Sequence, residues 1–226
     1  MHDYQQQFLD LALARQALRF GEFTLKSGRI SPYFFNAGLF SDGASMATLG
    51  RCYAAALVQS GLAFDVLFGP AYKGIPLVTA TAIAFAGQQQ RNVPWAFNRK
   101  ELKDHGESGQ VVGSALRGRI VIVDDVITAG TAIRESIELI LRAGAEPVAV
   151  ALALDREERG QAERSAVQEV EALYGLRCIA LLTLSELIAA LEAGMTAPGT
   201  RSSSAPSTQQ LAAMRSYRQK YGVTHT

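Results

Sequence analysis

The fold is decided by residues 119–132, RIVIVDDVITAGTA. Residues 120–123 are continuously apolar, which is typical of a strand covered on both faces, as in a parallel sheet. Asp124 and Asp125 follow directly, and a turn of small residues then leads into a segment with a helical apolar stripe. In an open α/β sheet, ligands bind beyond the carboxyl ends of the strands. The stretch therefore predicts a ligand site where this strand meets its helix.

The turn after the two aspartates suits a phosphate group. The amides of Ala129, Gly130 and Thr131 lie at the predicted helix start, where free N–H groups and the helix dipole favour an anion. Gly130 lets the backbone approach a ligand closely, and the hydroxyls of Thr128 and Thr131 can donate as well. The aspartates would repel a phosphate, so we expect them to accept from ribose hydroxyls or to hold the waters of Mg²⁺. Together these features describe a site for a sugar phosphate.

A simpler interpretation is that Thr128 caps a helix after an ordinary buried strand and that the aspartates are merely solvated. Two consecutive aspartates followed by Thr-x-Gly-Thr favour the functional interpretation, but the spacing alone does not name the ligand. The sequence contains neither a GxxxxGK[ST] nor a GxGxxG motif. This argues against a nucleotide triphosphatase and a dinucleotide-dependent dehydrogenase.

The segments on either side of this stretch alternate between strand and helix patterns. Periodicity predicts helices at 44–60, 74–87, 130–143 and 157–174, and strands at 64–69, 94–98, 119–124, 147–154 and 177–182. Strands separated by helices imply parallel βαβ units. The predicted fold class is therefore α/β, with a mostly parallel central sheet flanked by helices.

Other segments lie outside this alternation. Residues 3–20 predict an amphipathic N-terminal helix that Gly21 stops, and residues 23–36 predict a small hairpin outside the main sheet. Residues 195–209 have the composition of a flexible linker. The spacing of the apolar residues in 210–226 predicts a C-terminal helix that docks on the domain.

The polar segment that follows the predicted strand at 94–98 is unlike a core element. Residues 99–110, RKELKDHGESGQ, are too polar for the core and longer than a usual connection. The segment is therefore either a disordered excursion or a functional lid. Its cluster of charges favours a lid.

Length and charge bound the function further. The chain has 226 residues, with 22 Lys and Arg against 21 Asp and Glu, so its formal charge is +1. The length fits one decorated α/β domain or two small ones. A general polyanion binder shows a clear basic excess, so we expect no nucleic-acid partner, and any attraction to anions must be local.

Cysteines and apolar runs bear on location. Cys52 and Cys178 are not in a CxxC spacing and suggest two reduced, buried thiols rather than disulfides or a zinc site. No apolar run approaches the roughly 18 residues of a membrane span, and the first residues do not resemble a signal peptide. We therefore expect a cytoplasmic protein with no membrane partner.

Several blocks together resemble one family. Residues 121–132 resemble the phosphoribosyl-pyrophosphate motif of the type I phosphoribosyltransferases. The blocks TLKSGRISPYFFN (24–36), GPAYKGIP (69–76), FNRKELKDHG (97–106) and LDR (154–156) resemble, in that order, signature blocks of the orotate phosphoribosyltransferase family. The match runs from about residue 3 to 192 and resumes in the terminal helix.

The resemblance implies a type I phosphoribosyltransferase fold. Residues 1–194 would form one domain, with a small N-terminal hood built largely from 20–40 and a flexible catalytic loop. The reaction would transfer ribose 5-phosphate from 5-phosphoribosyl 1-pyrophosphate (PRPP) to orotate in the presence of Mg²⁺. Its products, orotidine 5′-monophosphate and pyrophosphate, belong to pyrimidine (UMP) biosynthesis. The family also implies a homodimer in which the loop 99–109 completes the neighbour's site.

The resemblance also assigns roles to single residues. The implied PRPP-binding residues are Lys26, Tyr72, Lys73, Arg99, Lys100, Lys103, His105, Asp124, Asp125, Val126, Ile127, Thr128, Ala129, Gly130, Thr131 and Ala132. The implied catalytic residues are Lys73, Arg99, Lys100, Lys103 and His105. The implied orotate-binding residues are Phe34, Phe35, Thr128 and Arg156, the last because its planar fork suits a carboxylate. No residue is assigned as a direct ligand of the metal.

Two alternatives belong to other classes. A regulator with this fold would bind the sugar pyrophosphate without catalysis, and would be expected to carry a DNA-binding segment or a basic face. A purine-specific transferase would share the donor motif but should lack the Phe34–Phe35 block and Arg156. The sequence favours the orotate enzyme over both.

Overall fold

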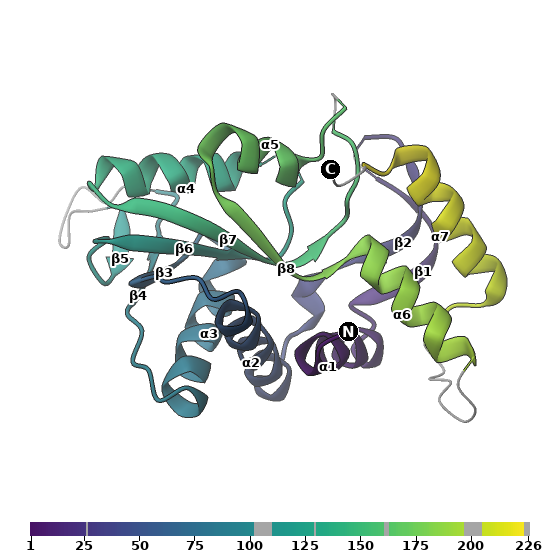
Figure 1. Cartoon of the computed structure of the whole chain (residues 1–226), viewed down its shortest axis with the longest axis horizontal. Helices are drawn as coiled ribbons and strands as arrows, with labels where there is room; N and C mark the ends of the chain where they lie inside the picture. Colours follow the sequence, from purple (N-terminus) through teal and green to yellow (C-terminus); the bar gives the residue numbers. More distant parts are fainter. Residues whose placement is uncertain (26, 102–109, 129, 161–162, 197–204, 224–226) are drawn as a thin grey trace.

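The computed structural model describes residues 1–25, 27–101, 110–128, 130–160, 163–196 and 205–223. Within them, a six-stranded sheet has the order β5-β4-β3-β6-β7-β8 (Figure 1). Its strands are β3 (Val66–Gly69), β4 (Trp95–Asn98), β5 (Val111–Gly113), β6 (Arg119–Asp124), β7 (Glu146–Asp155) and β8 (Arg177–Thr183). Neighbouring strands run parallel except for the antiparallel pair β4–β5. This confirms the predicted α/β class with a mostly parallel sheet.

Helices cover both faces of the sheet (Figure 1). α2 (Gly43–Gln59) and α3 (Gly74–Gln88) lie on one face, and α4 (Thr131–Arg142) and α5 (Ala166–Tyr174) lie on the other. The side chains of β6 alternate between the two cores: Val121 and Val123 face α2 and α3, and Ile120 and Ile122 face α4. All four are fully buried. The continuous apolar run of this strand follows from burial on both faces.

A smaller unit stands beside the β8 edge of the sheet. β1 (Leu18–Thr24) and β2 (Ile30–Phe35) form an antiparallel pair, which we call the hood, and the short helix η1 (Ala37–Leu39) follows it. α1 (Asp3–Ala14) packs against α2, and α6 (Leu184–Thr196) follows β8 directly. α7 (Thr208–Tyr221) packs against β2 and α6. Through α7, the end of the chain therefore returns to the hood near its beginning (Figure 1).

Two predicted helices are too long. The N-terminal helix, predicted at 3–20, ends at Ala14, because Gln16 takes a positive φ of 54° and Leu18 enters β1. The helix predicted at 157–174 begins at Ala166, where Ser165 caps it in a capping box with Gln168. Glu158 and Arg159 instead form isolated bridges with Gly222 and Ser165.

Some features were not predicted at all. β5 has three residues, which is too short for a periodic signal, and α6 follows β8 without a turn between them. Cys178 is partly exposed rather than buried, while Cys52 is buried, and both are free. None of the described helices is long and apolar enough to cross a membrane. Most of the tract predicted as a linker, residues 197–204, lies outside the described residues.

Candidate active site

The carboxyl ends of β3 and β6 bring Lys73 and Asp125 together. Lys73 Nζ lies 2.6 Å from Asp125 Oδ2, and the lysine side chain is 57% exposed whereas that of Asp125 is 7% exposed. Asp125 Oδ1 also accepts from the backbone N–H of Val126 at 2.9 Å. The carboxylate is thus held on both oxygens, while the lysine reaches the open edge of the sheet.

Asp124 has different surroundings from its neighbour. Its Oδ1 accepts from the Asp125 backbone N–H at 2.9 Å, and its backbone carbonyl accepts from the Tyr53 hydroxyl at 2.8 Å. Burial, reinforced by the charge of Asp125, raises the pKa of Asp124 to about 7. Asp124 and Asp125, which we call the acid pair, therefore differ. Asp125 is paired with Lys73, whereas Asp124 changes charge near neutral pH.

The start of α4 lies beside this acid pair. Gly130 is its N-cap residue, in a left-handed conformation with φ 71°, and no side chain caps the helix. The predicted contacts Thr128, Thr131 and Ala132 are exposed here. Val126 and Ile127 are partly buried and pack against the two different cores of the sheet. Ala129 lies outside the described residues. An exposed helix N-terminus beside two carboxylates suits a phosphorylated sugar.

A cleft of about 270 Å³ lies at the ends of β3 and β4. Its lining includes Tyr72, Asn98, Arg99 and Lys100. Lys100 Nζ lies 4.9 Å from the centroid of the Tyr72 ring. Asn98 Oδ1 accepts from the Ala71 N–H at 2.8 Å and so ties the loop after β3 to β4. The structure thus brings three predicted donor-site residues together and adds Asn98, which sequence reasoning missed although it stands next to Arg99.

The donor site was predicted to include three further residues. Lys26, Lys103 and His105 lie outside the described residues. The loop that carries the last two is described at its ends, where the Arg99 N–H donates to the Gln110 carbonyl at 2.8 Å. The excursion between β4 and β5 is therefore closed at its base.

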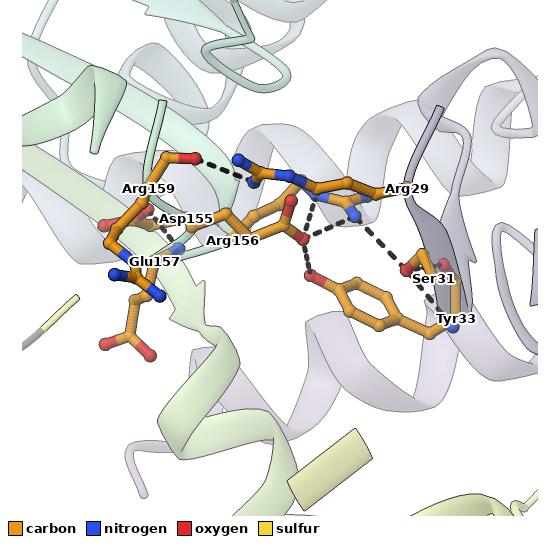
Figure 2. A network of polar contacts seen from close by, with 8 residues as sticks. Arg29, Ser31, Tyr33, Asp155, Arg156, Glu157 and Arg159 are labelled. Carbon is orange, nitrogen blue, oxygen red and sulfur yellow. Dashed lines mark hydrogen bonds and ion pairs between the residues drawn. The ribbon is translucent and has the colours of Figure 1, made fainter. Parts of the chain in front are cut away.

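Arg156 follows β7 at the same sheet edge and meets the hood (Figure 2). Its Nε and Nη2 donate to Glu158 Oε1 at 2.9 and 2.6 Å, and Nη2 contacts Ser31 Oγ at 3.3 Å. The guanidinium carbon stands 4.6 Å from the centroid of the Tyr33 ring. Its side chain is only 15% exposed. Ser31, Tyr33 and Glu158 were not singled out from the sequence, although each is within three residues of a predicted one.

Phe34 and Phe35, predicted together, have different environments. Phe34 is partly buried and stacks on Phe23 with ring centroids 5.5 Å apart. Phe35 packs against Phe8 and Phe40 at centroid distances of 6.1 and 6.2 Å. Successive strand residues point to opposite faces, so the Phe35 ring contributes to the core, while the Phe34 ring lies on the other face of the hood.

The acid pair is the nearest approach to a metal site in this region. Among the described residues, no group of three or more His, Cys, Asp and Glu side chains gathers in a way that could hold a metal ion. Carboxylate oxygens are nevertheless the ligands that Mg²⁺ prefers, usually with several waters retained. The two carboxylates of the acid pair therefore fit a magnesium ion that is held mainly by substrate and water.

Comparisons with known proteins agree with this geometry. The phosphoribosyl transferase domain family matches residues 41–173. The orotate phosphoribosyltransferase of Thioalkalivibrio sulfidiphilus is 59% identical over 225 residues, covering 99% of this chain and all of the relative, and that of Edwardsiella ictaluri is 58% identical with the same coverage. The crystal structure of orotate phosphoribosyltransferase from Francisella tularensis superimposes with a TM-score of 0.82 at 38% identity, covering 95% of this chain and 98% of that one. This chain belongs to the orotate phosphoribosyltransferase family.

Proposed function

We propose that this chain transfers ribose 5-phosphate from PRPP to orotate, giving orotidine 5′-monophosphate and pyrophosphate in pyrimidine nucleotide synthesis. The observation that carries the proposal is the arrangement at one sheet edge. The acid pair, Lys73 and the start of α4 suit a phosphorylated sugar, and Arg156 stands beyond the neighbouring strand β7. Full-length relatives at 57–59% identity bear the name of this enzyme.

The donor would lie across the ends of β3, β4 and β6. Its 5-phosphate would accept from the N-terminal amides of α4, and its ribose hydroxyls would donate to Asp124 and Asp125. Its pyrophosphate would meet the cations at the cleft beside Tyr72. Those cations are Lys73, Arg99 and Lys100, with Lys26, Lys103 and His105 assigned by resemblance alone.

The proposal includes Mg²⁺, which Asp124 and Asp125 would hold through water. When bound with the donor, the ion would neutralise negative charge on the departing pyrophosphate. A cation beside Asp124 also favours its ionised form, since its pKa is raised by burial and by a neighbouring negative charge.

Catalysis would rest on positioning and fixed charge. A ring nitrogen of orotate bonds to the anomeric carbon as the bond from that carbon to the pyrophosphate oxygen breaks, and the nitrogen loses its proton. The sugar gains oxocarbenium character while negative charge gathers on pyrophosphate. No protein nucleophile is needed; lysine and arginine side chains at the cleft stabilise the leaving group.

Arg156 would bind the orotate carboxylate. Its guanidinium presents a planar set of donors, and its low exposure strengthens the charge interaction. Phe34 and Phe35 would border the orotate ring through the backbone of β2, because their side chains point to opposite faces of the hood. Thr128, exposed before α4, would contact both ligands.

We also propose a cytoplasmic homodimer in which the loop 99–109 of one subunit acts at the site of the other. The base of the loop joins β4 to β5, which is the outermost strand of the sheet. The free thiols of Cys52 and Cys178 suit a reducing compartment.

A spectrophotometric assay tests the proposed function. Protein, Mg²⁺, orotate and PRPP are mixed, and loss of orotate absorbance is followed, with adenine or hypoxanthine in place of orotate as the control for a purine-specific enzyme. We expect orotate to be consumed, EDTA to stop the reaction, and no pyrophosphate release with the purines. Unchanged orotate absorbance at high enzyme concentration would refute the proposal and favour a non-catalytic binder of the sugar pyrophosphate.

A further inference from the structure

Beyond the predicted ligand contacts, the structure holds a compact group of side chains around Arg156. One oxygen of Glu158 receives both Nε and Nη2 of the guanidinium, and the same oxygen accepts from the Tyr33 hydroxyl at 3.3 Å (Figure 2). The Tyr33 ring lies against the face of the guanidinium. These contacts engage Nε and Nη2, and the Nη1 side of the fork lies outside this network.

The segment that carries Glu158 is anchored on both sides. The Glu157 N–H donates to Asp155 Oδ1 at 2.8 Å, and the Glu157 carbonyl accepts from the Val223 N–H at 2.8 Å. The buried Glu157 carboxylate accepts from the Ser185 N–H at 2.8 Å. The backbone that carries Glu158 is therefore held in place, and its carboxylate can hold the Arg156 guanidinium in one position.

Tyr33 is fixed from another direction. Its side chain is fully buried, and its ring meets the Tyr217 ring of α7 edge-on, with centroids 6.4 Å apart. Ser31 Oγ donates to the Tyr33 carbonyl at 2.7 Å, which holds this part of β2 in place. The hood and the C-terminal helix thus meet beside the arginine through Tyr33 and Tyr217.

We infer that Glu158 and Tyr33 are positioning residues, which hold the Arg156 guanidinium in the orientation that binds the orotate carboxylate. The inference rests on the proposed function of Arg156. An arginine side chain has many rotamers, and ordering it only when the ligand arrives reduces affinity. Two contacts to one carboxylate oxygen and an aromatic ring on one face remove that cost beforehand. The hood and α7 would then serve acceptor binding rather than stability alone.

Steady-state kinetics of four variants test this inference. Glu158→Ala removes the acceptor, Glu158→Gln keeps an oxygen without the charge, and Tyr33→Phe keeps the ring without the hydroxyl. Glu163→Gln is the matched control, because Glu163 lies in the same segment, is 93% exposed and pairs with Arg159 at 3.5 Å. The Michaelis constants for orotate and PRPP are measured for each, together with the thermal unfolding midpoint.

We expect Glu158→Ala to raise the Michaelis constant for orotate about tenfold while that for PRPP stays within about twofold. Glu158→Gln and Tyr33→Phe should raise the orotate constant about threefold, and Glu163→Gln should leave both unchanged. An equal rise in both constants, or no change for orotate, would overturn the inference. A lower orotate constant in Glu158→Gln would also overturn it, since Glu158 would then compete with the substrate carboxylate. If Glu158→Ala does not fold, the two milder variants decide by the same criteria.

The double variant Glu158→Ala/Arg156→Ala separates positioning from a general structural effect. If Glu158 acts through Arg156, its substitution adds nothing further to the orotate constant once the arginine is gone. A full additive effect would contradict the inference. An orotate constant that Arg156→Ala leaves unchanged would instead refute the proposed role of the arginine itself, so the two failures are distinguishable.

Discussion

Asp124 and Asp125 are adjacent in the chain, yet their carboxylates have different surroundings. Asp125 is held by Lys73 at 2.6 Å and by the Val126 backbone N–H at 2.9 Å. Asp124 is buried, and the nearest strong charge is the like charge of Asp125. At the scale of residues, the surroundings therefore make two side chains of the same type behave differently.

The first prediction concerns stability against pH. A folded-state pKa of about 7 for Asp124, above the ordinary 3.8, means that the folded protein binds this proton more tightly. The resulting stability is present below about pH 4 and is lost as pH rises through 7. Without Mg²⁺ or PRPP, calorimetry should show the unfolding midpoint of Asp124→Asn rising relative to the parent between pH 4 and 8. A difference that is constant with pH would contradict the raised pKa.

The second prediction compares two buried tyrosine hydroxyls. Tyr53 donates to the Asp124 carbonyl at 2.8 Å, whereas the Tyr217 hydroxyl has no hydrogen bond of standard geometry among the described residues and has only weaker interactions with Glu158 and Arg156. Tyr53→Phe should lower the free energy of unfolding by about 1 kcal/mol, and Tyr217→Phe should leave it nearly unchanged. Urea denaturation measures both. Equal losses would show that the Tyr53 contact contributes nothing specific.

At the scale of elements, the start of α4 combines a backbone requirement with a binding role. The third prediction separates these with two glycines that have similar positive φ, Gly130 at 71° and Gly175 at 66°. Alanine at either should cost about 1 kcal/mol of stability, because a side chain is strained in this conformation. Only Gly130→Ala should also raise the Michaelis constant for PRPP. If both variants bind PRPP as the parent does, the helix start is not the phosphate site.

Elements with a local signal could be predicted from the sequence. The apolar run of β6 predicts a strand buried on both faces, and the turn after the two aspartates predicts a ligand site. The predicted start of α5 was wrong because residues 157–160 pair with distant segments: the Arg159 N–H donates to the Tyr221 carbonyl at 2.9 Å and the Val223 N–H to the Glu157 carbonyl. Helical composition alone does not reveal such long-range pairing.

The same limit applies to the site. Lys73 and Asp125 follow strand ends, so parallel topology predicts that they meet. The surroundings of Arg156 depend on Ser31 and Tyr33, which lie 125 or 123 positions earlier and approach only after the hood has packed. Whether the ring of Phe34 or that of Phe35 is in the core depends on which side of β2 faces it. The two adjacent phenylalanines in the sequence do not specify that side.

At the scale of the whole molecule, the formal charge of +1 conceals a separation of charge. Lys100 lines the cleft at β3 and β4, Lys73 pairs with Asp125 at the end of β6, and Arg156 follows β7. A small substrate with many negative groups thus meets local positive charge on a nearly neutral protein. This agrees with the exclusion of a general polyanion binder.

The fourth prediction tests whether subunits share sites. Lys103→Ala alters the loop 99–109, and Asp125→Asn alters the acid pair; each variant alone should have little activity. If the loop serves the neighbouring subunit, mixing them should restore about a quarter of the parent activity, because random exchange gives mixed dimers with one intact site each. A mixture that stays as inactive as its components after verified subunit exchange would exclude sharing across a dimer.

The central claim is that donor and acceptor bind at separate groups of residues on one sheet edge. The pair of Michaelis constants of Arg156→Ala tests it most directly. Loss of a nearly buried charged contact should raise the constant for orotate at least about tenfold and leave that for PRPP within about twofold. Equal changes in the two constants, or a larger change for PRPP, would contradict the account.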